Sequence, residues 1–132
     1  MFAARPGFFR RAYGPGWALV GDAGYFKDPI TSHGLTDALR DAELLARAIV
    51  STLISGAHET VALASYQDTR DRLSERLFAT TDAIASFAWD LDQIPRLLME
   101  LSDAMGDELD LLTQLERSRR GAASASIPGR GK

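Results

Sequence analysis

The stretch "GWALVGDAGYFKDPITSHGLTDALRDAELLARAI", residues 16–49, decides the fold because it joins an apolar run, a glycine-bounded loop and a helical pattern. Residues 17–20 form the apolar run, which predicts a short strand covered on both faces. Only one other segment, around residues 7–13, is predicted to be extended. A sheet of one or two strands is marginal in water, so this strand lacks the neighbours that it would need.

The rest of the chain is predicted to be helical. From Leu35 the apolar residues recur at steps of three and four, which predicts a helix packed against a core and ended by Gly56. A second helix is predicted to begin near residues 58–60 and to run into the seventies or eighties. Pro95 suits the first turn of a third helix, which we expect to be bent or interrupted near Gly106. The apolar stripe of the first helix comprises Leu35, Ala38, Leu39, Ala42, Leu45, Ala46, Ile49 and Leu53. The predicted fold class is mostly α with one or two short strands.

The composition predicts one folded, soluble domain. Of the 132 residues, 45% are hydrophobic and 25% are charged, which is typical of globular proteins and unlike disordered ones. The chain contains no cysteine, which excludes disulfides, thiolate nucleophiles and cysteine-based metal sites and favours a reducing compartment. Pro6 and the pair Arg10 and Arg11 interrupt the opening residues. We therefore predict no signal peptide, no membrane span and a cytoplasmic location.

The net charge of −3 hides an uneven distribution. Residues 12–115 contain seven Lys and Arg residues but seventeen Asp and Glu residues, which makes this part of the chain a poor surface for nucleic acid. Residues 117–132 are basic and rich in small residues. We therefore predict a folded domain over 1–116 and a disordered tail over 117–132. The alternative for the tail is contact with an anionic partner.

A candidate ligand site follows the apolar run. Ligands of α/β folds bind beyond the carboxyl ends of strands, and Gly21 and Asp22 stand at that point. Gly21 lets the backbone approach a ligand closely, and Asp22 offers two acceptor oxygens to the hydroxyls of a sugar or polyol. The alternative is that Asp22 is buried and caps its own loop.

The start of the first helix is the second part of the candidate site. Pro29 fixes the path of the loop, and Gly34 allows a tight turn into the helix. The amides of Leu35 and Thr36 have no intrahelical partner there, and the helix dipole adds a positive end that attracts an anion. The alternative is that the side chain of Ser32 or Thr36 caps an ordinary helix that binds no ligand.

Catalytic and metal sites are not predicted. His33 has one histidine companion, His58, at the far end of a long helix, so no set of metal ligands is evident. The sequence contains no nucleophile elbow, phosphate-binding loop or dinucleotide fingerprint. The carboxylates stand on helix faces with arginine partners, where we expect them to be solvated.

The string "GDAGYFKDPITSHGLTDALRDAELLA" resembles the second FAD-binding motif of the flavoprotein monooxygenases similar to para-hydroxybenzoate hydroxylase, whose relatives include flavin-dependent halogenases and geranylgeranyl reductases. The family pattern is Gly-Asp, a proline seven residues after the Asp, a glycine twelve after it, and a helix with Ala-x-x-Asp-Ala-x-x-Leu-Ala. These positions are Gly21, Asp22, Pro29, Gly34 and residues 38–46. Thr31 stands where many members have a glycine, which makes the loop more similar to that of the halogenases and reductases, so the reaction subclass stays open.

The resemblance implies a cofactor and a role for each matched residue. Asp22 would bind a ribityl hydroxyl of FAD, and Pro29 would lie beside the isoalloxazine ring. The amides of Leu35 and Thr36 would face N1 and O2 of the flavin, where the reduced flavin carries its negative charge. Asp41 would hold the helix to the loop. The implied activity is that of an oxidoreductase whose flavin is reduced by NAD(P)H and acts on an organic substrate.

The resemblance also implies that parts of the enzyme are missing. The chain has no Gly-x-Gly-x-x-Gly segment for the ADP half of FAD and no substrate sheet, so it resembles the C-terminal portion of a Rossmann-like flavoprotein, with sheet partners elsewhere. The chain alone would then bind FAD weakly or not at all and lack activity. The expected partners are FAD and either an N-terminal complementing polypeptide or a second copy of the chain. The alternative is a cofactor-free helical interaction module, whose partner would cover the strand edge and the helix stripe.

Overall fold

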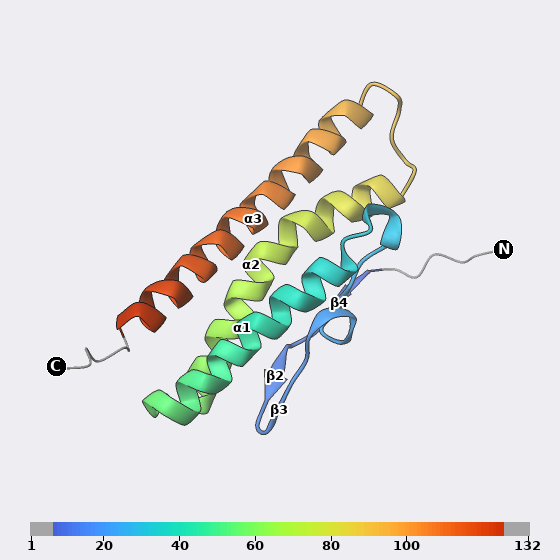
Figure 1. Cartoon of the computed structure of the whole chain (residues 1–132). Helices are drawn as coiled ribbons and strands as arrows, with labels where there is room; N and C mark the ends of the chain where they lie inside the picture. The colour runs from blue at the N-terminus through green and yellow to red at the C-terminus, as the bar shows by residue number, and fades with distance from the viewer. Residues whose placement is uncertain (1–6, 126–132) are drawn as a thin grey trace.

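The computed structural model describes residues 7–125, which are mostly helical (Figure 1). This confirms the prediction of a mostly α chain with short strands. No helix in the described range is both long enough and apolar enough to cross a membrane. The elements are β1 (Phe8–Phe9), β2 (Tyr13–Gly14), β3 (Trp17–Ala18), the 3-10 turn η1 (Gly21–Ala23), β4 (Tyr25–Phe26), the 3-10 turn η2 (Pro29–Thr31), α1 (Gly34–Ser55), α2 (Glu59–Ala85) and α3 (Ile94–Ala125).

The three helices lie side by side, with α2 in contact with both α1 and α3 (Figure 1). A tight turn at Gly56 reverses the chain between α1 and α2. Gly56 has a φ of 67°, in the left-handed region that favours glycine, and its N–H donates to the carbonyl of Ser51. The end of α1 at this glycine is as the sequence predicts. The start of α3 at Ile94 likewise places Pro95 in the first turn, where the missing N–H costs no helical hydrogen bond.

The strands form two antiparallel pairs, β1 with β4 and β2 with β3. In the second pair Tyr13 lies opposite Ala18, and Gly16 in the connecting turn has a φ of 76°. The strand predicted over residues 17–20 is therefore shorter than expected. The expectation that its sheet partners lie outside this chain is wrong for β3, because the turn folds it back on β2.

Helix α3 differs from its prediction in two ways. It continues through Gly106 without interruption, so the break expected there is wrong. One exposed glycine costs a helix roughly 1 kcal/mol, and the contacts of α3 with α2 on either side offset this. The helix also continues to Ala125, past the expected domain boundary at residue 116. Residues 126–132 of the predicted tail lie outside the described range.

The apolar core is small and lies where α1, α2 and the β2–β3 hairpin meet. Its buried members are Ala12, Leu44, Ala48, Ala62, Leu63 and Tyr66. The hydroxyl of Tyr66 donates to the carbonyl of Leu19 at 2.6 Å, which ties the end of the hairpin to α2. This core therefore positions the loop that follows β3 against the helices.

Helix α1 turns its predicted core stripe toward solvent. Leu35 is 74% exposed, Leu39 64% and Leu53 78%, whereas the buried residues of α1 are Asp37, Arg40, Asp41, Leu44 and Ala48. The predicted packing is therefore wrong for six of the eight stripe residues, which are exposed, whereas Ala38 and Leu45 are half-buried and Leu45 packs against the core. Periodicity identifies the stripe but not the side that is covered, and here the covered side holds charged groups that have partners in the loop and in α3.

Candidate functional site

The candidate site lies in the loop between β3 and α1, at the first turn of α1. A hollow of about 90 Å³ is formed there by Asp22, Tyr25, Phe26, Lys27, Asp28, Pro29, Ser32, Gly34 and Asp37. Of the six predicted cofactor-binding residues, Asp22, Pro29 and Gly34 line this hollow. Leu35, which follows Gly34 in α1, is exposed, and Thr36 is half-buried. Ligand pockets usually hold roughly 300–1,000 Å³, so this hollow alone is too small to enclose a ligand of that kind.

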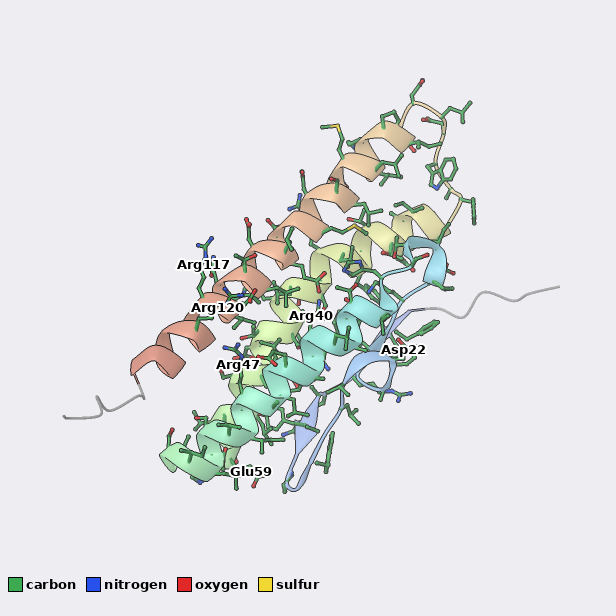
Figure 2. The ribbon with its side chains drawn as sticks, viewed as in Figure 1. Asp22, Arg40, Arg47, Glu59, Arg117 and Arg120 are labelled. Atoms are coloured by element: carbon green, nitrogen blue, oxygen red, sulfur yellow. The ribbon has the colours of Figure 1, made fainter. Side chains whose placement is uncertain are left out.

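Asp22 is the free acceptor of this wall. Its side chain is exposed in the loop beside the first turns of α1 (Figure 2), and it accepts no hydrogen bond from any residue in the described range. One of its oxygens lies 3.9 Å from the position that a Cβ on Gly34 would take. The alternative that Asp22 is buried and caps its own loop is therefore wrong. Its carboxylate is therefore available to a hydrogen-bond donor of a ligand that lies at the start of α1.

The N-terminus of α1 is open as well. His33 occupies the capping position without a side-chain hydrogen bond to the helix, and the backbone N–H of Asp37 donates to the His33 carbonyl at 3.1 Å. Within residues 7–125, no acceptor is found for the amides of Leu35 and Thr36. The alternative in which Ser32 or Thr36 caps the helix is therefore wrong. The positive end of the dipole faces outward near Asp22.

Gly21 has a different role from its predicted contact with a ligand. It is buried with a φ of 54°, and a Cβ placed on it would lie 3.0 Å from the Cβ of Ala38. Its N–H donates to Asp41 at 3.1 Å in a buried hydrogen bond. The glycine thus lets the η1 turn pack directly on α1. The predicted role of Asp41, to hold the helix to the loop, is confirmed by this bond.

A buried cluster of charged residues is centred on Arg40 of α1, which Figure 2 labels. The Arg40 guanidinium is 1% exposed and donates to three carboxylates, those of Asp37 at 3.2 Å, Asp41 at 2.8 Å and Glu108 at 2.8 Å. The same guanidinium donates to the Tyr25 hydroxyl at 3.1 Å and to Ser74 at 2.9 Å. These bonds join β4, α1, α2 and α3 at one point.

Two residues of the loop also join this cluster. The ammonium of Lys27 pairs with Asp37, and the imidazole Nε2 of His33 contacts Glu108. The loop is therefore fixed from behind while its outer surface stays open. The cluster was not predicted from the sequence, because the helix carboxylates were expected to be solvated. The signal was available in α1, where Asp37 and Asp41 share the helix face of Leu44 and Ala48.

The cluster brings together three groups that are common metal ligands. One ligand atom each from His33, Asp37 and Glu108 lies within 4.8 Å of the other two. The prediction that His33 has no suitable companion therefore overlooked the carboxylates. Both carboxylates are already paired with Lys27 or Arg40, so an entering divalent cation would meet two positive side chains. This arrangement favours an ion-pair cluster over a metal centre.

Lys27 gives the free energy of unfolding a pH dependence that can be measured. Lys27 is 8% exposed, and burial, with the nearby Arg40 charge, lowers its pKa from 10.5 to about 8. Between these values the unfolded chain keeps a proton that the folded chain has lost. The free energy of unfolding should therefore rise with pH in this window, by up to about 3 kcal/mol.

Two buried tyrosines set the upper end of the pH range in which the free energy of unfolding rises. Burial raises the pKa of Tyr25 and of Tyr66 above the usual 10. Above about pH 10 the unfolded tyrosines ionise while the folded ones stay protonated, so stability falls again. Urea unfolding across this range should show a maximum near pH 10, and Lys27→Met should lose the rise but keep the fall. A flat profile in the natural chain between about pH 8 and 10 would contradict the assignment to Lys27.

The open carboxylate, the exposed proline ring and the uncapped helix start thus share one surface, with a rigid ionic support behind it. This surface can accept hydrogen bonds from hydroxyls through Asp22 and donate them to an anion through Leu35 and Thr36. Comparisons with protein-family models, with curated proteins and with solved structures found no match to the chain.

Proposed function

We propose that the loop and the first turn of α1 hold the ribityl and isoalloxazine side of FAD in a flavin-dependent oxidoreductase. The observation that supports this most is that the unpaired carboxylate of Asp22 lies close to Gly34, beside the open N-terminus of α1. A ribityl chain carries hydroxyl donors, and a reduced flavin carries a negative charge at N1 and O2. Both features of the cofactor thus meet a complementary group on this wall.

Each residue has one task in this proposal. Asp22 accepts a hydrogen bond from a ribityl hydroxyl, and the exposed ring of Pro29 packs against the isoalloxazine. The amides of Leu35 and Thr36 donate to the pyrimidine edge of the ring, where they favour the reduced, anionic flavin. Gly34 leaves room for the cofactor because it has no side chain at the centre of the wall.

The remainder of the cofactor needs a second polypeptide surface. A hollow of about 90 Å³ is too small to enclose a flavin, and neither the pyrophosphate nor the adenosine has a partner in this wall. We therefore propose that a complementing polypeptide supplies the ADP-binding part and the substrate pocket. In the complete assembly NAD(P)H would reduce the flavin, and the reduced flavin would act on an organic substrate.

Three flavins that differ by one part each test the proposal. Lumiflavin carries the ring, riboflavin adds the ribityl chain, and FAD adds the ADP half. With a trace of flavin and increasing protein, flavin fluorescence should show riboflavin binding about tenfold more tightly than lumiflavin, because one hydrogen bond to a charged group is gained. FAD should bind no more tightly than riboflavin. Equal affinity for lumiflavin and riboflavin would sink the proposal.

The variant Asp22→Ala makes this test specific. Asp22 is exposed and accepts no hydrogen bond in the described part of the chain, so its loss should leave the fold intact. The variant should bind lumiflavin as the natural chain does and lose the preference for riboflavin. Asp82→Ala removes another exposed carboxylate, on α2, and should leave the preference unchanged.

A second candidate function rests on a different observation, the exposed apolar face of α1. A helix of a monomeric protein normally covers its apolar stripe, yet α1 exposes Leu35, Leu39 and Leu53. This exposed face supports the second candidate function, in which the chain is a cofactor-free interaction module that binds a partner. In that case none of the three flavins binds, and the chain remains folded.

A further inference from the structure

The apolar face of α1 is regular along the whole helix. We define the outer face of α1 as Leu35, Leu39, Ala42, Ala46, Ile49 and Leu53. All six residues are exposed, and they follow one another at alternating steps of four and three residues. This is the spacing of the seam of a coiled coil, in which one helix packs along another. The outer face is therefore better suited to packing against a second helix than to packing against an irregular surface.

The order of large and small residues makes the outer face complementary to itself. In an antiparallel pair related by a two-fold axis, Leu35 lies opposite Leu53 and Leu39 opposite Ile49. At the centre Ala42 and Ala46 lie opposite each other, and their small side chains let the two backbones approach closely. A two-fold interface requires one patch to match its own copy, and this sequence pattern meets that requirement.

A groove lies at one end of the outer face. The groove has a volume of about 380 Å³ between α1, α2 and the β2–β3 hairpin, and its apolar lining includes Trp17, Leu45, Ile49, Leu53 and Leu63. In the antiparallel pairing, Leu35 of the second copy comes opposite Leu53, at this groove. The two-fold axis creates the same contact twice. Large apolar side chains that fill pockets are the usual anchors of an interface.

The charges of α1 do not oppose a second copy. Five residues of α1 are charged, and three of them, Asp37, Arg40 and Asp41, are buried on the opposite face. The remaining two, Glu43 and Arg47, pair with each other at 2.8 Å. Each copy therefore brings a balanced pair to the border of the outer face, and no unpaired charge of α1 has to be desolvated.

From these features we infer that two copies of the chain associate through the outer face of α1, antiparallel and about a two-fold axis. This inference does not rest on the flavin proposal, because none of its contacts involves a cofactor. It concerns the same helix end, however, since Leu35 would be covered in the pair.

Mass measurement without flavin tests this inference. At about 100 µM, light scattering or sedimentation should give a mass near twice 14.4 kDa, because apolar interfaces of this type reach micromolar dissociation constants. Ala46→Lys should give the monomer mass with an unchanged helical circular dichroism spectrum. Ala79→Lys, at an exposed position of α2, is the matched control and should remain dimeric. A monomeric natural chain, or a dimer that Ala46→Lys leaves intact, would overturn the inference.

Cysteine pairing tests the antiparallel geometry separately, because the natural chain has no cysteine. Two variants, Leu39→Cys and Ile49→Cys, are mixed in equal amounts and oxidised. The pairing proposed here brings these two positions together, so peptide mapping should find mainly the mixed disulfide. If each variant links mainly to itself, or if no disulfide forms, the antiparallel pairing is wrong.

Discussion

Replacing Arg40 with methionine is expected to lower the free energy of unfolding by about 4 kcal/mol, the largest effect of any single change at the site. The guanidinium is the shared partner of the carboxylates of Asp37, Asp41 and Glu108, and all three are buried. Methionine keeps much of the volume but leaves these charges facing one another, with Lys27 as their remaining close cation. Urea unfolding at about pH 7 measures the loss.

A control variant compares this buried arginine with an exposed one. Arg76→Met removes a partly exposed arginine that pairs with Asp107 on α3, and it should cost less than about 1 kcal/mol. A deficit for Arg40→Met that is no larger than the deficit for Arg76→Met would contradict the role assigned to Arg40.

Gly21→Ala is expected to cost roughly 3 kcal/mol, the second largest effect. The left-handed φ of 54° accounts for part of this cost, because a Cβ is disfavoured in that region. The rest arises because the new Cβ would lie 3.0 Å from the Cβ of Ala38, so the η1 turn has to move away from α1. This movement weakens the hydrogen bond from the Gly21 N–H to Asp41.

Gly56→Ala is the matched control for this prediction. Gly56 also has a left-handed backbone, with a φ of 67°, but among residues 7–125 no atom beyond its own chain neighbours lies within 4 Å of the position of its missing Cβ. Its substitution should therefore cost only the backbone strain, about 1 to 2 kcal/mol. If both substitutions cost the same in urea unfolding, the close packing of η1 on α1 is not what requires glycine at position 21.

The helices were predictable because their ends carry local signals. Helix α1 begins at Gly34 and ends before Gly56, and Pro95 marks the first turn of α3. Each of these residues acts through the conformation of its own backbone. The uninterrupted passage of α3 through Gly106 was not predictable, since it depends on packing against α2. Local chemistry thus places the helix ends, whereas continuity across a weak residue is decided by tertiary contacts.

The site was predictable only in its outer half. Asp22 and the open start of α1 follow from their places after a strand and before a helix. The inner half depends on Arg40 and Glu108, which are 68 residues apart and meet only when α3 packs against the other helices. The burial of this pair also decides which side of α1 is covered. Helical periodicity shows two faces of α1 and does not reveal that the charged face is the inner one.

The most direct test of the flavin site is to map where a flavin touches the chain. FMN, which is soluble and carries both the ring and the ribityl chain, is added to ¹⁵N-labelled protein, and the amide shifts are followed. The largest changes are predicted at Asp22, Gly34, Leu35 and Thr36, and they should shrink in Asp22→Ala. If the amides of these residues do not shift, or if the largest shifts lie at the groove beside Trp17, the loop does not hold the flavin.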